Sequence, residues 1–187
     1  MPKRPAKDGG HTAFTDHRIT RHIEPEGTVS EGELTAWREP ARQFRDRNLA
    51  LALATEGMEN SVPAQVIRGY RMLNRMDLKD DPAALTVLGT ILLTAKEARE
   101  AEQRFSLALS LKPNYAPYEV NLAEALMQES DPAAATPHLE HALALDPLLP
   151  QAVRLLEQIY RAQGQMTKAD QIRDRYNQAM GIHVKPN

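Results

Sequence analysis

Large and small apolar residues recur in a fixed order between Pro82 and Pro147, and this order occurs twice, first from residue 82 and again from residue 116. The first copy consists of Leu85, Leu88, Gly89, Leu92, Ala101, Phe105, Ala108 and Pro113. The second copy has Leu122, Ala123, Leu126, Ala135, Leu139, Ala142 and Pro147 in the same register, and Glu119 is its only departure. Small residues let two antiparallel helices approach closely, while the large ones fill the space between helix pairs. The pattern therefore predicts two helix pairs, over residues 82–115 and 116–149.

The helical period continues toward the N-terminus in a less regular form. Residues 41–79 predict a diverged first pair, with one helix ending near Gly57 and a second running from about Ser61 to Met76. Ser61 is expected to cap this second helix, because serine is a common N-cap and Pro63 follows in the first turn.

This period, from Leu88 to Leu122 or from Leu92 to Leu126, together with these residue sizes resembles the tetratricopeptide repeat family. The resemblance implies an all-α fold: a right-handed superhelix of antiparallel helix pairs over residues 41–181. Residues 150–181 form its degenerate, capping repeat, residues 182–187 a tail, and residues 1–40 an irregular arm.

The arm is rich in glycine, threonine, proline and charge and shows no apolar stripe that could pack. Three of the six histidines of the chain, His11, His17 and His22, lie within twelve residues of it. Neutral imidazole is a common ligand of haem iron and of zinc, but a solvated arm explains the same composition more simply.

The arm also resembles multihaem c-type cytochromes, through Met1-Pro2-Lys3-Arg4, Gly9-Gly10-His11-Thr12 and Thr15-Asp16-His17-Arg18-Ile19. In that family Met-Pro-Lys typically follows a haem-binding C-x-x-C-H, and a later histidine in an Asp-His pair serves as the distal ligand of a neighbouring haem. The resemblance implies that His17, then His11 and more weakly His22, are distal haem ligands. It also implies a periplasmic or extracellular protein, whereas the literal N-terminus, which lacks a signal-peptide core, indicates the cytoplasm.

Composition limits the chemistry. The chain has no cysteine, which excludes disulfides, thiolate catalysis and a haem attached through a C-x-x-C-H of its own. Haem c therefore requires a native protein that extends further N-terminally; otherwise the arm is vestigial. A net charge of −2 gives no reason to expect nucleic acid as a partner, and no apolar run approaches the roughly 18 to 20 residues of a membrane span. No catalytic or phosphate-binding motif is present, so no catalytic residue is expected.

His138 and His141 share one face of a predicted helix at a spacing of three residues, which could in principle hold a metal ion. No third ligand accompanies them, and they flank the core positions Leu139 and Ala142. Surface histidines without a metal are therefore the favoured interpretation.

Tetratricopeptide arrays usually bind partners on a concave surface lined by the first helix of each pair. The register predicts that this surface consists of Thr86, Thr90, Leu93, Val120, Asn121, Glu124, Met127, Arg154, Gln158 and Arg161. The lysine and asparagine positions of the carboxylate clamp found in chaperone-binding members are mostly unfilled, since only Asn121 matches. Chaperone-tail binding is not expected.

These observations predict a module for protein–protein interaction and assembly. The leading hypothesis makes it the C-terminal part of an exported multihaem cytochrome involved in electron transfer; the alternative is a cofactor-free scaffold or adaptor. Protein partners are expected in both, with self-assembly through the repeat ends or the arm as a further mode.

Overall fold

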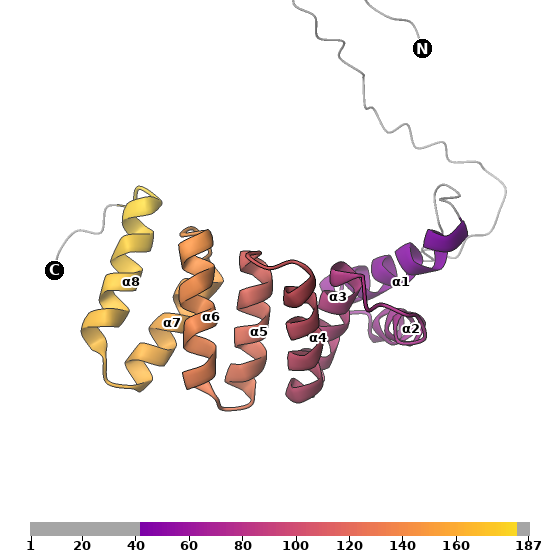
Figure 1. The fold of residues 1–187 in the computed structure, drawn as a ribbon, viewed down its shortest axis with the longest axis horizontal. Coiled ribbons are helices and arrows are strands. Elements are labelled where there is room, and N and C mark those ends of the chain that lie inside the picture. The colour runs from indigo at the N-terminus through magenta and orange to yellow at the C-terminus, as the bar shows by residue number, and fades with distance from the viewer. Residues whose placement is uncertain (1–41, 183–187) are drawn as a thin grey trace, which may run out of the picture. The chain divides into compact units, whose positions relative to one another are not determined.

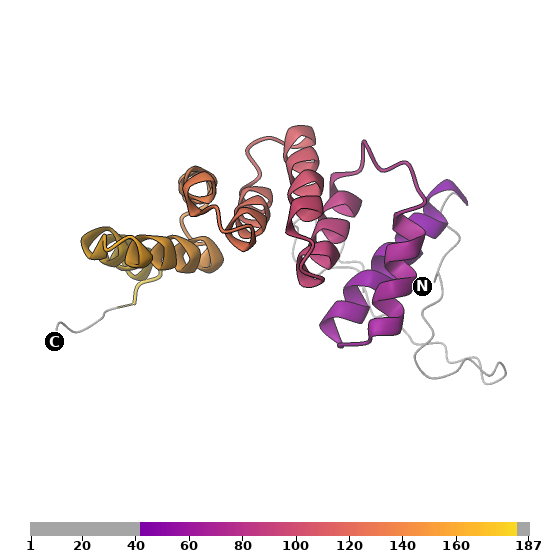
Figure 2. The same ribbon diagram turned by 90° about the horizontal axis from the view of Figure 1, so that it is seen from below.

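The computed structural model describes residues 42–182, which form eight helices and no strand (Figure 1). The helices are α1 (Arg42–Glu59), α2 (Pro63–Leu73), α3 (Pro82–Thr94), α4 (Ala98–Leu111), α5 (Ala116–Gln128), α6 (Pro132–Leu145), α7 (Pro150–Ala162) and α8 (Met166–Ala179). Each odd-numbered helix packs against the next as a hairpin, and Figures 1 and 2 show the hairpins following one another from α3 to α8. The all-α superhelix of helix pairs is confirmed.

The last three hairpins share one register. Helices α3, α5 and α7 begin at residues 82, 116 and 150, and α4, α6 and α8 begin at residues 98, 132 and 166. The helix ends follow the same constant interval, which is the length of one repeat. A position in one hairpin can therefore be compared directly with the position one repeat away in the next.

The turn inside each of these hairpins has the same construction. Lys96, Ser130 and Gly164 occupy its left-handed position with φ of 70°, 66° and 74°. The amide of the next residue then donates to the carbonyl five residues back, at 2.8–2.9 Å. Only Gly164 reaches this conformation without the steric cost that a Cβ atom brings.

The first hairpin differs from the prediction at both helix ends. Helix α1 continues to Glu59, two residues beyond Gly57, and α2 covers only Pro63–Leu73. Ser61 does not cap α2, because Ser61 occupies the left-handed position of the turn with φ of 56°. The N-cap is Val62, whose side chain makes no capping hydrogen bond.

Close packing holds the first hairpin together, and an ion pair joins it to the second. A Cβ atom on Gly69 would lie 2.7 Å from the backbone nitrogen of Ala54, so α1 and α2 touch through their backbones. Arg47 donates from Nε and Nη2 to the two carboxylate oxygens of Asp81, at 2.6 and 2.8 Å. Asp81 also accepts the amide of Ala84 and thereby caps α3.

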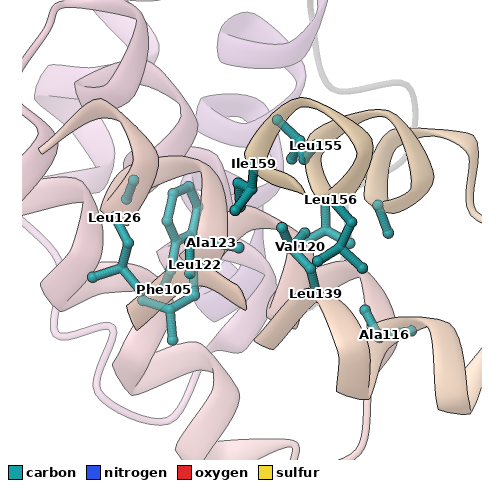
Figure 3. Packing of buried hydrophobic residues seen from close by; sticks show 14 of the residues in the cluster. Phe105, Ala116, Val120, Leu122, Ala123, Leu126, Leu139, Leu155, Leu156 and Ile159 are labelled. Carbon is teal, nitrogen blue, oxygen red and sulfur yellow. The ribbon is translucent and has the colours of Figure 1, made fainter. Parts of the chain in front are cut away.

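Small and large residues face each other where the two helices of a hairpin meet, and the pair changes along the array. In the second hairpin Gly89 receives the ring of Phe105, which occupies the space that a Cβ of residue 89 would need. The corresponding residues of the third hairpin are Ala123 and Leu139, both buried (Figure 3). In the fourth hairpin the same positions hold Glu157 and Arg173, which form an ion pair at 3.3 Å. The core contact thus becomes polar at the C-terminal end.

No helix between residues 42 and 182 is both long and apolar enough to cross a membrane.

Candidate interaction surfaces

Several of the predicted concave residues are already engaged within the array. The hydroxyls of Thr86 and Thr90 donate to carbonyls of their own helix, Pro82 O at 2.8 Å and Thr86 O at 3.0 Å. Leu93 and Met127 are half-buried and pack against the core. These four positions therefore offer little hydrogen-bonding capacity to a partner.

Val120 corrects the predicted list. It is only 2 % exposed and lies in the same core cluster as Leu139 and Leu156 (Figure 3). Its apolar side chain is covered where α5 and α7 pack together, so it forms part of the core and no part of a binding surface.

Two charged residues of the list have partners inside the chain. Glu124 accepts a hydrogen bond from Gln151 at 2.5 Å. Arg161 donates to Glu157 at 2.7 Å and lies 3.6 Å from Asp170.

Asn121, Arg154 and Gln158 form a different group. None of the three makes a hydrogen bond or ion pair with any residue that the structure describes, and Arg154 and Gln158 are exposed. They lie on the neighbouring helices α5 and α7. Of the polar side chains predicted to line the concave surface, these are the ones with unused hydrogen-bonding groups.

The predicted haem ligands His11, His17 and His22 lie outside the described residues. Within residues 42–182 no three histidine or acidic side chains come close enough together to hold a metal ion.

The site that the sequence did not predict is a buried carboxylate with two histidines. Glu119 has a side chain only 6 % exposed, and its Oε2 and Oε1 atoms lie 2.7 Å from Nδ1 of His138 and of His141, respectively. An ionised carboxylate only accepts hydrogen bonds, so both Nδ1 atoms carry a proton and donate. The two histidines are therefore the partners that make a buried glutamate acceptable in this core.

This cluster occupies one of three equivalent grooves. Glu119, His138 and His141 correspond, one repeat earlier, to Leu85, Arg104 and Leu107, which line a cavity of about 210 Å³ next to the α2–α3 loop. One repeat later, the same three positions are Val153, Ile172 and Arg175. These line a larger groove of about 570 Å³ between α6, α7 and α8. We call this last one the C-terminal groove.

Polar groups surround the apolar floor of the C-terminal groove. The hydroxyl of Tyr160 donates to Glu140 at 2.6 Å, and burial together with this carboxylate raises the pKa of Tyr160 to about 12. The ammonium of Lys168 lies 5.3 Å from the centre of the same ring. Lys168 and Arg175 are exposed at the rim and form no ion pair with a described residue. The rim therefore carries two cationic groups free to meet a carboxylate.

Comparison with solved structures places this architecture. A crystal structure of MamA matches with a TM-score of 0.63 and 16 % identity, covering 78 % of this chain and 82 % of that one. PilF of Pseudomonas aeruginosa matches with a TM-score of 0.60 and 23 % identity, covering 73 % and 61 %. An O-GlcNAc transferase of Thermobaculum terrenum matches with a TM-score of 0.52 and 26 % identity, but the match covers only 23 % of the transferase chain.

These neighbours are tetratricopeptide-repeat proteins, so the described part of the chain has the fold of a tetratricopeptide array. No protein-family model and no curated protein matches the sequence. At these identities the likeness concerns the fold alone.

Proposed function

We propose that the chain is a protein-interaction module that binds a segment of a partner protein along α5 and α7 of its array. The observation that carries the proposal is the group of Asn121, Arg154 and Gln158, whose side chains find no partner within the described residues. A bound segment would supply the hydrogen bonds that these groups lack. The fold supports this, because stacked helix pairs create extended surfaces for binding.

A pull-down from native extract tests the proposal. The bait is the wild-type chain, the triple variant N121A/R154A/Q158A, or a control variant R99A/Q103A. Arg99 and Gln103 are exposed on α4, and neither pairs with a described residue. A partner retained by the wild type and the control but lost by the triple variant, with the loss repeated for purified components by calorimetry, supports the proposal. Equal retention by all three baits refutes it.

The finer form of the proposal places the module in an exported multihaem cytochrome, in the periplasm or outside the cell. It rests on the resemblance of residues 1–22 and on His17, His11 and His22, which lie outside the described residues. The described residues contribute no ligand to such a haem, because His138 and His141 are engaged with Glu119.

An absorption spectrum and an intact mass of the protein from its native source decide between this form and a cofactor-free scaffold. A Soret band, a reduced α-band and a mass above 20.9 kDa support the cytochrome form. A colourless protein of 20.9 kDa leaves the cofactor-free scaffold.

A further inference from the structure

The three equivalent grooves of the array differ in what fills them. In the middle groove the chain supplies its own occupant, the Glu119 carboxylate held by His138 and His141. In the C-terminal groove Val153 replaces the glutamate and Arg175 takes the place of His141. The position of the acid is thus vacated, while a donor of the kind that held it is kept.

The C-terminal groove combines this donor with an apolar floor. Leu143, Val153, Leu156 and Ile172 line it, and its volume of about 570 Å³ lies within the range of ligand pockets. Val153 and Leu156 are buried, whereas Leu143 and Ile172 remain partly accessible. A branched aliphatic side chain of a partner can therefore bury against Leu143 and Ile172.

Charge decides which partner suits the rim. Lys168 and Arg175 contribute two positive charges without an acidic partner, and Glu140, the one carboxylate lining the groove, accepts the Tyr160 hydroxyl. The rim therefore has a net positive charge. An arginine in a partly apolar site binds a carboxylate more strongly than a fully hydrated arginine does, because the surrounding dielectric is lower.

We propose that the C-terminal groove binds an acidic segment of a partner protein, with an aspartate or glutamate side chain on Arg175 and a neighbouring aliphatic side chain on the apolar floor. A side-chain carboxylate is the source because Glu119, the internal precedent, is one. This inference goes beyond the function proposed above, since it concerns a different set of residues from Asn121, Arg154 and Gln158.

The first test is selection from a random library of about twelve residues displayed on phage, in which the peptides have no free C-terminus. The library is panned on the wild-type chain after depletion on the variant K168E/R175E. Both substituted residues are exposed, so the variant keeps the fold. The expected peptides carry Asp or Glu next to Leu, Ile or Val. The absence of enrichment, or enrichment without acidic residues, overturns the proposal.

The enriched peptide is then synthesised with an amidated C-terminus and titrated by fluorescence polarisation. R175E should raise its Kd at least about tenfold, because it replaces an attraction with a repulsion. The matched control R99E makes the same change of charge on α4 and should leave the Kd within about twofold. Equal effects of R175E and R99E, or binding only by the peptide with a free C-terminal carboxylate, contradict the proposal.

An internal competitor gives an independent readout. V153E places a glutamate where Glu119 stands in the middle groove, next to Arg175, and should abolish peptide binding. V153Q has nearly the same shape without the charge and should bind the peptide more tightly than V153E does. If V153E binds as well as the wild type, the carboxylate site is not in this groove. The triple variant N121A/R154A/Q158A should bind the peptide normally, so failure here and failure of the proposed function are distinguishable.

Discussion

Removing both histidine partners of Glu119 should destabilise the array far more than removing the glutamate itself. In H138A/H141A the carboxylate stays on α5, 6 % exposed, and loses hydrogen bonds to two nitrogens at 2.7 Å. Hydrogen bonds to charged groups contribute about 1.5–3 kcal/mol each, and breaking a buried pair by removing one partner costs about 3–5 kcal/mol.

The expected cost lies below the sum of these values. The histidine side chains are 32 % and 44 % exposed, so water enters the space they leave and hydrates the carboxylate in part. We expect H138A/H141A to lower the free energy of unfolding by about 2–3 kcal/mol. Urea unfolding followed by circular dichroism at pH 7 measures this change.

The matched variant is E119L, which restores the residue type of the equivalent Leu85. Replacing a buried ionic group by an apolar one of similar volume is often neutral or stabilising, so E119L should stay within about 1 kcal/mol of the wild type. In the E119L background, H138A/H141A should cost less than about 1 kcal/mol, because no carboxylate remains to be satisfied. A double histidine variant as stable as the wild type, or E119L less stable than H138A/H141A, would refute this account of the cluster.

Three further predictions concern other contacts. G89A should lower the stability by about 1–3 kcal/mol in urea unfolding despite its better helix propensity, because the new Cβ overlaps the Phe105 ring; G89A/F105L, which copies Ala123 and Leu139, should recover most of the loss. The hydrogen bond from Arg47 lowers the pKa of Asp81, so this pair stabilises the fold above about pH 4 and the contribution is lost as pH falls through the lowered pKa. D81N should therefore be less stable than the wild type by about 1 kcal/mol at pH 7, and the difference should shrink near pH 2; a constant difference would contradict the pairing. In an ultraviolet titration one of the five tyrosines should ionise only near pH 12, and Y160F should lose that step.

The repeat register could be predicted because it depends on side-chain size alone. Small residues such as Gly89 and Ala123 must face large ones wherever two helices touch, and this requirement leaves a period in the sequence. The ends of the first hairpin were harder, because Ser61 suits an N-cap by type but occupies the left-handed turn position. Residue type does not distinguish these two roles.

The Glu119 cluster escapes prediction because its parts belong to separate patterns. Glu119 is a single exception to an apolar pattern, and His138 and His141 are a pair without a third ligand. A buried carboxylate needs donors, so an acid at an apolar position calls for a search for donors on the adjacent helix. Such a search finds the two histidines.

Val120 and the C-terminal groove show a different limit. Val120 shares the register of Thr86 and Arg154, which are half-buried and exposed, and it is buried only because of how α5 and α7 pack. The groove results from Val153 being smaller than the space that Glu119 and its partners fill one repeat earlier. Both depend on the fit between neighbours, which a one-dimensional pattern does not contain.

Site-specific photo-crosslinking in the native host tests most directly whether the array binds a partner as proposed. A benzophenone amino acid replaces Gln158 on α7 or, as the control, Arg99 on α4; both residues are exposed and unpaired with any described residue. We predict that position 158 yields a discrete crosslinked product with a partner protein, that the product disappears in the N121A/R154A background, and that position 99 yields none. No product at position 158, or the same product at both positions, would contradict the central claim.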